Sequence, residues 1–306
     1  MIDFVGKKQW FLLASAIAII VGIVFLAVFR LTPGADFSGG TAITLRFTPP
    51  VEQNQLRQGV AELGYGGATI QTAGEGVFLM HLKEISSEEA DIVTGQLGEK
   101  LNSQIEVVDY YLVSPTVGTE TARNAGIAVV VAAVAMLLYI VWAFRRMPKP
   151  FRWGTCAIIA LIHDVFIIVG IFSILGRVAG VEVDALFITG LLAVVGYSIN
   201  DTVVIFDRIR ENMTRGVSPD FAVTVNSSIV ETLTRSLNTA LTTLFVLSAL
   251  FLFGGATIHY FVLILLLGVV IGTYSSICIA SQLLVVWEKG EWGRLSSWLP
   301  FVKRPA

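Results

Sequence analysis

Six long apolar runs, separated by polar segments, dominate the hydropathy pattern of this chain. Each run approaches or exceeds the roughly 20 residues that a helix needs to cross the hydrocarbon core of a bilayer. No small-residue cleavage site ends the first run before Arg30, so we expect a retained span rather than a signal peptide. The pattern therefore predicts six transmembrane helices, over residues 10–29, 125–144, 154–175, 185–206, 237–253 and 260–287.

The polar segment between the first two runs has the pattern of a small α+β domain. Helical spacing covers 51–63, and a second helix begins after Ser86, with Glu89 at the capping-box position. Apolar and polar residues alternate, as they do in strands, over 42–47, 68–72, 77–82 and 105–113. The order β-α-β-β-α-β is that of the ferredoxin-like sandwich, which we expect here.

Positively charged residues predict the side of the membrane on which each segment lies. Lys and Arg gather at the N-terminus, in the loops after the second and fourth spans and in the tail, whereas the opposite short loops hold only Arg177. Loops rich in Lys and Arg stay in the cytoplasm. We therefore expect a cytoplasmic N-terminus and first span in 1–30, an external domain in 31–123, the other spans in 124–288 and a cytoplasmic tail in 289–306.

Composition supports the membrane assignment. The chain has 306 residues, 55% hydrophobic and 14% charged, and its mean hydropathy is +0.75, whereas soluble domains carry about 25% charged residues. A net charge of −2 gives no reason to expect a nucleic-acid partner. Two cysteines in apolar runs and three scattered histidines predict no disulfide framework, no metal site and no cofactor.

Three charged residues stand out: Asp164 and Asp201 inside predicted spans, and Arg235 two residues before the fifth span. Such groups are costly in a membrane and are candidates for function. Asp201 lies about 25 Å along its helix from the external side, and Arg235 lies about 28 Å from that side on the next span. The two residues are therefore expected at a similar depth, where they can meet.

Two interpretations of Asp201 remain open at this point. A static ion pair with Arg235 would hold two helices together. Alternatively, burial raises the pKa of a carboxyl group and a nearby arginine lowers it, so the group can gain and lose a proton near neutral pH. Protonation would then be coupled to helix movement.

Polar neighbours of these charges are candidate supporting residues. Tyr197 and Asn200 lie within one turn of Asp201, and Thr239 follows Arg235 by one turn. Asp164 either belongs to the same relay or accepts a hydrogen bond in helix packing. Small residues recur every fourth position on the last span and predict close helix packing, at Gly268, Gly272, Ser276 and Ala280.

Three stretches closely resemble the SecF family, whose members are the smaller subunits of the bacterial SecD–SecF complex of protein secretion. They are GADFSGGT at 34–41, GYSINDTVVIFDRIREN at 196–212, and the pair TLTRSLNTALTTL at 232–244 and GTYSSICIA at 272–280. The resemblance extends over essentially the whole chain. Ser236 and Ala240 depart from the family pattern, in which we expect Thr and Ser.

The resemblance implies a function that the residues alone do not give. Members of this family belong to the resistance–nodulation–division superfamily and use the proton motive force to help secreted chains through the SecYEG channel. Asp201 matches the family's proton-carrying carboxylate and Arg235 its arginine on the fifth span. The stretch near the end of the first span matches an external signature, at Asp36, Phe37, Gly39 and Gly40.

The same resemblance predicts partners and location. We expect a separate SecD chain, the SecYEG translocon, an unfolded secretory polypeptide and membrane lipid as partners, and no enzymatic activity. The expected location is the bacterial inner membrane. Alternatives are a proton-coupled exporter of small molecules or lipids, a scaffold that transduces no energy, and an intramembrane aspartyl protease, whose Gly-x-Gly-Asp motif is absent from the run that ends at Asp201.

Overall fold

The computed structural model describes residues 2–291, and this part of the chain contains six helices that are long and apolar enough to cross a membrane. The sixth span is built from α9 (His259–Ser275), the π-helical segment η3 (Ser276–Ala280) and α10 (Ser281–Lys289). The other five are α1 (Lys8–Phe29), α5 (Pro115–Ala143), α6 (Pro150–Ala179), α7 (Ala185–Arg215) and α8 (Phe221–Phe253). The prediction of six spans is confirmed. Most of the predicted tail, 289–306, lies outside the described residues.

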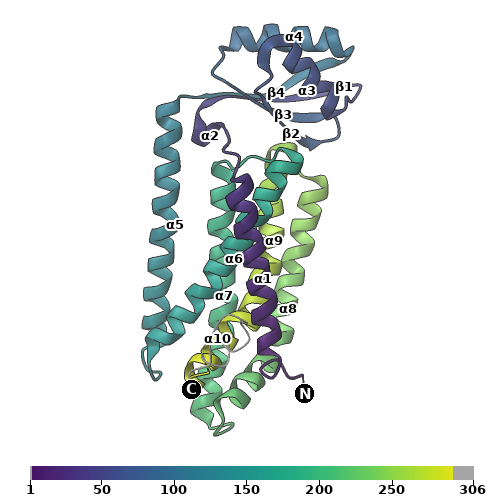
Figure 1. Cartoon of the computed structure of the whole chain (residues 1–306). Helices are drawn as coiled ribbons and strands as arrows, with labels where there is room; N and C mark the ends of the chain where they lie inside the picture. Colours follow the sequence, from purple (N-terminus) through teal and green to yellow (C-terminus); the bar gives the residue numbers. More distant parts are fainter. Residues whose placement is uncertain (1, 292–306) are drawn as a thin grey trace.

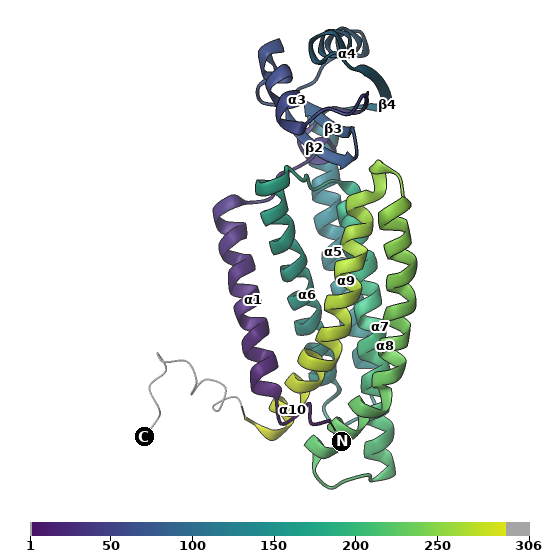
Figure 2. The same ribbon diagram turned by 90° about the vertical axis from the view of Figure 1, so that its right-hand side faces the viewer.

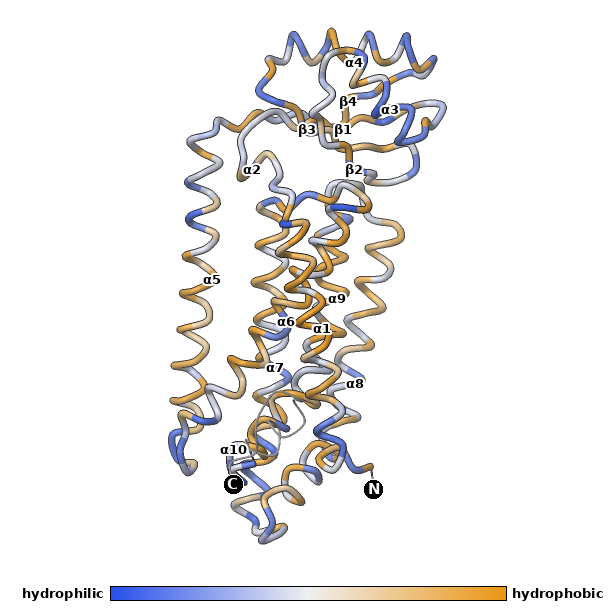
Figure 3. Tube along the Cα trace, in the orientation of Figure 1, coloured by the Kyte–Doolittle hydropathy of each residue, from blue (hydrophilic) through white to orange (hydrophobic). Residues whose placement is uncertain are grey.

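Five of the spans form one bundle (Figures 1 and 2), and α5 stands apart from it along most of its length (Figure 1). α5 joins the bundle near its C-terminal end, where Phe144 stacks on Trp153 of α6 and meets Phe206 of α7 edge to face. Figure 3 shows apolar residues along all the spans and polar residues concentrated in the loops at the end remote from the α+β domain. The exposed apolar surface of these helices suits a lipid environment.

The α+β domain connects α1 to α5 and follows the predicted order of elements. Its elements are a short helix α2 (Ala35–Ser38), β1 (Gly40–Thr48), α3 (Gln53–Val60) with a final turn at η1 (Ala61–Tyr65), β2 (Thr69–Gly74), β3 (Val77–Leu82), α4 (Ser87–Leu101) and β4 (Gln104–Val113). Ser86 and Glu89 form the predicted capping box: the Ser86 Oγ accepts the Glu89 N–H at 3.2 Å and the Glu89 carboxylate accepts the Ser86 N–H at 3.0 Å.

All neighbouring strands of the sheet are antiparallel, in the order β2-β3-β1-β4. In the central strand, Ile43 pairs with Met80 on β3 and with Tyr110 on β4. The helices α3 and α4 cover one face of the sheet, and a buried cluster that includes Leu45, Leu56 and Leu97 fills the space between them. This arrangement confirms the expected fold class.

The hairpin between α7 and α8 lies at the end of the bundle remote from the α+β domain, called the loop end below. It is more helical than expected. The hydropathy pattern ends the fourth span near residue 206 and begins the fifth near residue 237, whereas α7 continues to Arg215 and α8 already starts at Phe221. Gly216, at φ 71°, ends α7, and the Asp220 side chain caps α8 by accepting the Ala222 N–H at 2.9 Å. Local capping and polar packing therefore extend both helices beyond their apolar parts.

Small residues allow α9 to pack closely against α7, as the four-residue repeat predicts. Gly268 lies directly against the isopropyl group of Val194, and Gly272 lies against Ser198. A side chain at Gly268 would overlap Val194, which is stiff at χ1 and cannot turn away. The repeat therefore sets the distance between the two helices.

We expect Gly268→Ala to lower the free energy of unfolding of the detergent-solubilised protein by about 1–3 kcal/mol, because the added methyl group forces α7 and α9 apart. A Cβ at Gly196 on α7 would meet no neighbouring atom within 4 Å, so Gly196→Ala is the matched control and should change stability by less than about 1 kcal/mol. Thermal unfolding of both variants checks this, and equal midpoints would contradict the packing account.

Candidate functional site

Asp201 lies on α7 with its carboxylate between α7 and α8. Its Oδ1 accepts a hydrogen bond from the Ser236 hydroxyl of α8 at 2.6 Å. Its Oδ2 is buried and has no hydrogen-bond partner among residues 2–291. An unpaired carboxylate oxygen away from water is costly when the group is ionised, and the cost falls when the group takes up a proton. The site is therefore suited to a carboxyl group that changes its protonation state.

Arg235 lies at the depth of Asp201, as expected, but does not face it. It is exposed on α8 and forms no ion pair with any residue of the described chain, so the expected contact with Asp201 is wrong for this conformation. Successive helical residues are rotated by about 100°, and α8 turns Ser236 rather than Arg235 toward α7. The hydroxyl that binds Asp201 thus belongs to one of the two positions that depart from the family pattern.

Arg235 belongs to a polar stripe on the exposed face of α8. Asn238, Thr239 and Thr242 continue the stripe, and all are exposed. The Thr239 hydroxyl donates to the Arg235 carbonyl at 2.9 Å, and the Thr242 hydroxyl donates to the Asn238 carbonyl at 3.0 Å. Thr239 therefore supports the helix backbone and makes no contact with Asp201. An arginine on an apolar helix face requires a counter-charge, water or another polar partner.

Asp164 sits at the centre of a buried network that joins three spans. Its Oδ1 lies 2.8 Å from the His163 Nδ1 in the same helix, α6. Its Oδ2 accepts hydrogen bonds from Ser198 of α7 at 2.6 Å and Ser275 of α9 at 2.8 Å. Asp164 was a predicted candidate, whereas His163 and Ser275 were not; the hydroxyl-rich run on the last span was the available signal.

Hydroxyl groups continue from this network toward Asp201. The Ser276 hydroxyl lies 2.9 Å from that of Thr202 and donates to the Ser198 carbonyl at 3.3 Å. Thr202 follows Asp201 directly in α7. Of the other predicted supporting residues, Tyr197 is half-buried one turn from Asp201, whereas Asn200 is exposed and lies outside the network.

The stretch 34–41 fixes the α+β domain to the ends of the spans. The Asp36 carboxylate accepts the N–H of Ala185, the first residue of α7, at 2.9 Å, and Phe37 packs against the apolar cluster at this end of the bundle. Gly39 and Gly40 have φ of 74° and 119°, which favour glycine. A Cβ at Gly39 would overlap the backbone of Pro115, where α5 begins.

The sheet docks on the α6–α7 loop through side chains of β2 and β3. Gln71 accepts the Glu182 N–H at 2.9 Å, and the His81 Nδ1 lies 3.0 Å from the Glu182 carboxylate. The His81 Nε2 lies 3.1 Å from the Gly39 carbonyl. Carboxylates and carbonyls only accept, so a doubly protonated His81 is the form that satisfies both contacts.

A cavity of ≈ 220 Å³ lies beside this docking contact and is strongly acidic. Burial raises the pKa of the Asp184 carboxyl, and the charges of Asp36 and Glu182 raise it further. Burial and the same carboxylates raise the pKa of Tyr111. The lining includes Asp36, Gln71, Asp109, Tyr111, Glu182 and Asp184.

Docking of the domain should weaken as pH rises. Burial alone lowers the pKa of His81, but the hydrogen bond to Glu182 and its charge outweigh burial, so the pKa of His81 is raised above its usual 6.5. A raised pKa stabilises the docked state fully below the ordinary histidine pKa and loses that effect as pH rises through the folded value. We expect a loss of about 1 kcal/mol, or roughly fivefold in the undocking equilibrium.

Hydrogen–deuterium exchange of residues 180–184, corrected for the intrinsic pH dependence, measures this effect. His81→Asn should remove the pH dependence, and His259→Asn, at the start of α9, is the control. A profile that His81→Asn leaves unchanged would exclude His81 as the origin.

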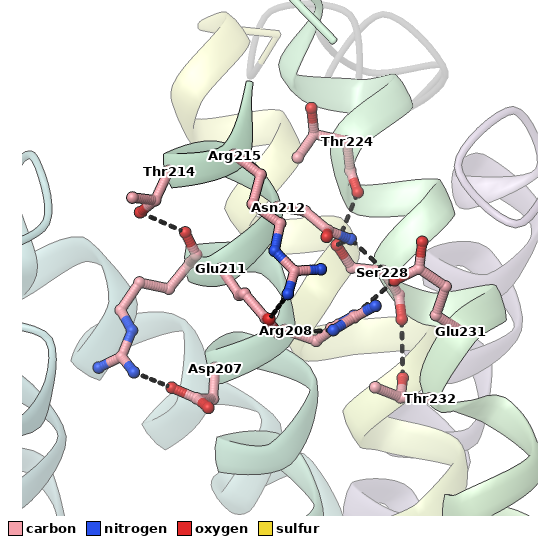
Figure 4. A network of polar contacts seen from close by, with 11 residues as sticks. Asp207, Arg208, Glu211, Asn212, Thr214, Arg215, Thr224, Ser228, Glu231 and Thr232 are labelled. Atoms are coloured by element: carbon pink, nitrogen blue, oxygen red, sulfur yellow. Dashed lines mark hydrogen bonds and ion pairs between the residues drawn. The ribbon is translucent and has the colours of Figure 1, made fainter. Parts of the chain in front are cut away.

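The loop end of α7 and α8 carries a network of charges (Figure 4). Arg208 bridges Glu211 of its own helix and Glu231 of α8. Asn212 is buried and donates to the Ser228 hydroxyl at 3.0 Å and to Glu231 at 3.1 Å. Outer pairs join Asp207 to Arg210 and Glu211 to Arg215. The network holds the two long helices together beyond their apolar parts.

Comparison with known proteins gives one consistent family. The chain matches the family "Protein export membrane protein SecD/SecF, C-terminal" over residues 93–290 and the SecD/SecF GG motif over residues 24–51. The protein translocase subunit SecF of Thermobaculum terrenum is 44% identical over 96% of both chains. The protein translocase subunit SecDF of Bacillus subtilis is 35% identical, and this chain spans 38% of its length.

A solved structure supports the same assignment. The crystal structure of SecDF from Thermus thermophilus, described as a translocon-associated membrane protein, has a TM-score of 0.84 and 36% identity. The match covers 94% of this chain and 39% of the SecDF chain. With 44% identity to a full-length relative and a family match over most of its spans, this chain belongs to the SecF family of protein translocase subunits.

Proposed function

We propose that this chain uses the proton motive force, together with a SecD subunit, to promote translocation of secreted proteins through SecYEG. The observation that carries the proposal is the half-buried Asp201 carboxyl, with one oxygen bound by Ser236 and the other, Oδ2, buried and unpaired among residues 2–291. A proton that enters neutralises the group, and its release restores the charge. The environment of α7 therefore differs between the two states.

α7 links this site to the α+β domain. Asp201 lies in the middle of the helix, and the Asp36 carboxylate binds the N–H at the beginning of the same helix. A shift of α7 would therefore reach the stretch 34–41 and the sheet that follows it. One proton that crosses 100 mV supplies about 2.3 kcal/mol, which is enough to change the balance between two helix arrangements but little more.

The polar stripe with Arg235 supports a SecD partner. Arg235, Asn238 and Thr242 are exposed on α8 in the described part of this chain. In two relatives named SecDF, the matching region is 38% and 39% of a longer chain. A SecD half that covers α8 would supply the polar partner that the Arg235 guanidinium requires and would bring it into the transport pathway.

The distribution of Lys and Arg supports the orientation. The hairpin between α7 and α8 and the loop between α5 and α6 each carry a cluster of basic residues, and both lie at the end opposite the α+β domain. We infer that this end and both termini are cytoplasmic, in a bacterial inner membrane. The α+β domain then lies outside, where it can meet an emerging, unfolded polypeptide, and lipid surrounds the spans.

Two alternatives receive less support. An exporter of small molecules would need a less charged cavity, because ligand pockets are mostly apolar, whereas the cavity below the sheet is acidic. A static brace between Asp201 and Arg235 would need an ion pair that residues 2–291 do not form.

Membrane vesicles that contain the translocon test the proposal. Adding this chain with its SecD should increase translocation while a proton gradient is present, and a protonophore should remove the increase. An increase that survives complete loss of the gradient would point to the scaffold instead.

A further inference from the structure

His163 and Asp164 form a buried acid–base pair that the proposed mechanism does not use. Both are almost fully buried, at 3% and 1% exposure. The Asp164 Oδ2 accepts from two serine hydroxyls, on α7 and α9, and its Oδ1 faces the His163 Nδ1 at 2.8 Å. When Asp164 is ionised its Oδ1 can only accept, so in that state the His163 Nδ1 carries the hydrogen in this contact.

The other ring nitrogen of His163 is then free to bind a proton. Its Nε2 is buried and has no hydrogen-bond partner within residues 2–291. With the hydrogen on Nδ1, Nε2 holds a lone pair in the neutral ring. The pair has a net charge of −1 in this state, and a proton on Nε2 brings the net charge to zero. Removing a net charge from a buried apolar site is favourable.

The pair is placed to influence the turn of α7 that bears Asp201. Ser198, which donates to Asp164, lies three residues before Asp201, or about 4.5 Å along the helix. Ser276 joins the Ser198 carbonyl to the Thr202 hydroxyl. Nearby titratable groups are Tyr197 and Asp201, on this part of α7, and Tyr274 of α9, whose ring stacks on His163 with centroids 6.3 Å apart.

α1 contributes an uncharged contact to this region. Its Ser15 hydroxyl lies 3.1 Å from the Tyr274 hydroxyl. Cys278 lies one turn after Tyr274 in η3 and is a buried free thiol. Among the described residues of these helices, therefore, no Lys or Arg pairs with the Asp164 carboxylate, and the charge of this pair depends on the state of the His163 ring.

We propose that His163 and Asp164 form a second proton-binding site in this chain, with the His163 Nε2 as the acceptor. One proton enters, forms an N–H bond with the lone pair of Nε2, and leaves by the reverse step, and no other bond changes. The change in charge reaches α7 through Ser198 and α9 through Ser275. The role of the site in transport rests on the proposed function, but its proton binding does not.

Nitrogen NMR of the histidine rings measures proton binding directly. The chain has three histidines, so ¹⁵N-histidine labelling of the protein with its SecD subunit in lipid vesicles gives few signals, and His81→Asn and His259→Asn assign them. We expect the His163 ring to change from singly to doubly protonated between about pH 9 and about pH 5. A His163 ring that keeps one protonation state over that range overturns the proposal, and this measurement needs no variant at residue 163 or 164.

Variants separate this proposal from the role of Asp201. In Asp164→Asn the His163 midpoint should fall by at least about one pH unit, a tenfold loss of proton affinity, because the carboxylate charge is gone; an unchanged midpoint overturns the pair. In Asp201→Asn, His163 should still titrate. If that variant titrates and also translocates normally, the proposed function fails and the second proton site stands.

A transport assay then tests the role of the pair. His163→Phe keeps an aromatic ring against Tyr274 but cannot take up a proton, and we expect gradient-dependent translocation to fall at least threefold. The matched control is Ser173→Ala in the same helix. The buried Ser173 hydroxyl donates only to backbone carbonyls, those of Phe25 in α1 and of Arg30 at the C-terminal end of α1. Equal activity of His163→Phe and Ser173→Ala would remove the pair from the transport pathway.

Discussion

Asp201→Asn should abolish gradient-dependent stimulation of translocation while the protein still inserts and assembles. The amide keeps the size of the side chain and an oxygen that can accept the Ser236 hydroxyl. Its NH₂ group then lies where Oδ2 has no partner among residues 2–291, which costs about 1–3 kcal/mol, too little to unfold the protein. The amide cannot gain or lose a proton, so translocation should fall to the level measured without a gradient.

Asp207→Asn is the matched control for this experiment. Asp207 lies on the same helix but is exposed, and it pairs with Arg210 at the loop end. The loss of an exposed ion pair costs less than about 1 kcal/mol and should leave the stimulation intact. Both variants are compared in vesicles that contain equal amounts of the SecD–SecF pair. Full stimulation by Asp201→Asn would show that Asp201 carries no proton during the cycle.

The second large effect is expected at Gly40. Its φ of 119° is a conformation that residues with a side chain rarely adopt. A Cβ at this position would also overlap the Leu82 carbonyl and approach the His81 ring. Gly40→Ala should therefore cost about 2–4 kcal/mol through backbone strain and overlap. The loss should appear as a domain that separates from the spans more readily.

Limited proteolysis measures this separation. The sites followed are the α6–α7 loop, on which the sheet docks, and residues 31–40. Gly67→Ala is the matched control in the same domain, because a Cβ at Gly67 would have no neighbouring atom within 4 Å. Cleavage of Gly40→Ala should be at least tenfold faster than cleavage of the control. Equal rates would mean that this turn relaxes without cost.

Hydrophobic pattern predicted the fold well because both parts of the molecule depend on simple periodicities. A span needs only length and apolar composition, and the strands of the α+β domain alternate because one face of the sheet packs on α3 and α4. The pattern failed at the α7–α8 hairpin, where polar contacts rather than apolar burial extend the helices. Asn212, the key residue there, looks like any other polar residue in the sequence.

The candidate site was predictable in depth but not in direction. Counting residues along two spans places Asp201 and Arg235 at similar levels, because the rise per residue is constant. The face that each residue presents depends on how the helix is rotated, and a shift of one residue is enough to exchange Arg235 for Ser236. Nothing in the sequence of α8 fixes that rotation. It is set by contacts with α7 and α9.

The π-helical segment at 276–280 changes the phase of the last span. It places one additional residue in a turn, and the Ser281 hydroxyl, five positions on, donates to the Ser276 carbonyl at 2.8 Å. Before the segment, Gly272 faces Ser198, and after it Leu284 and Val285 enter the apolar cluster at the loop end. Deleting one residue there would turn the terminal half by about 100° against the first. The last span therefore buries one face before the segment and a different face after it, which a regular helix could not do.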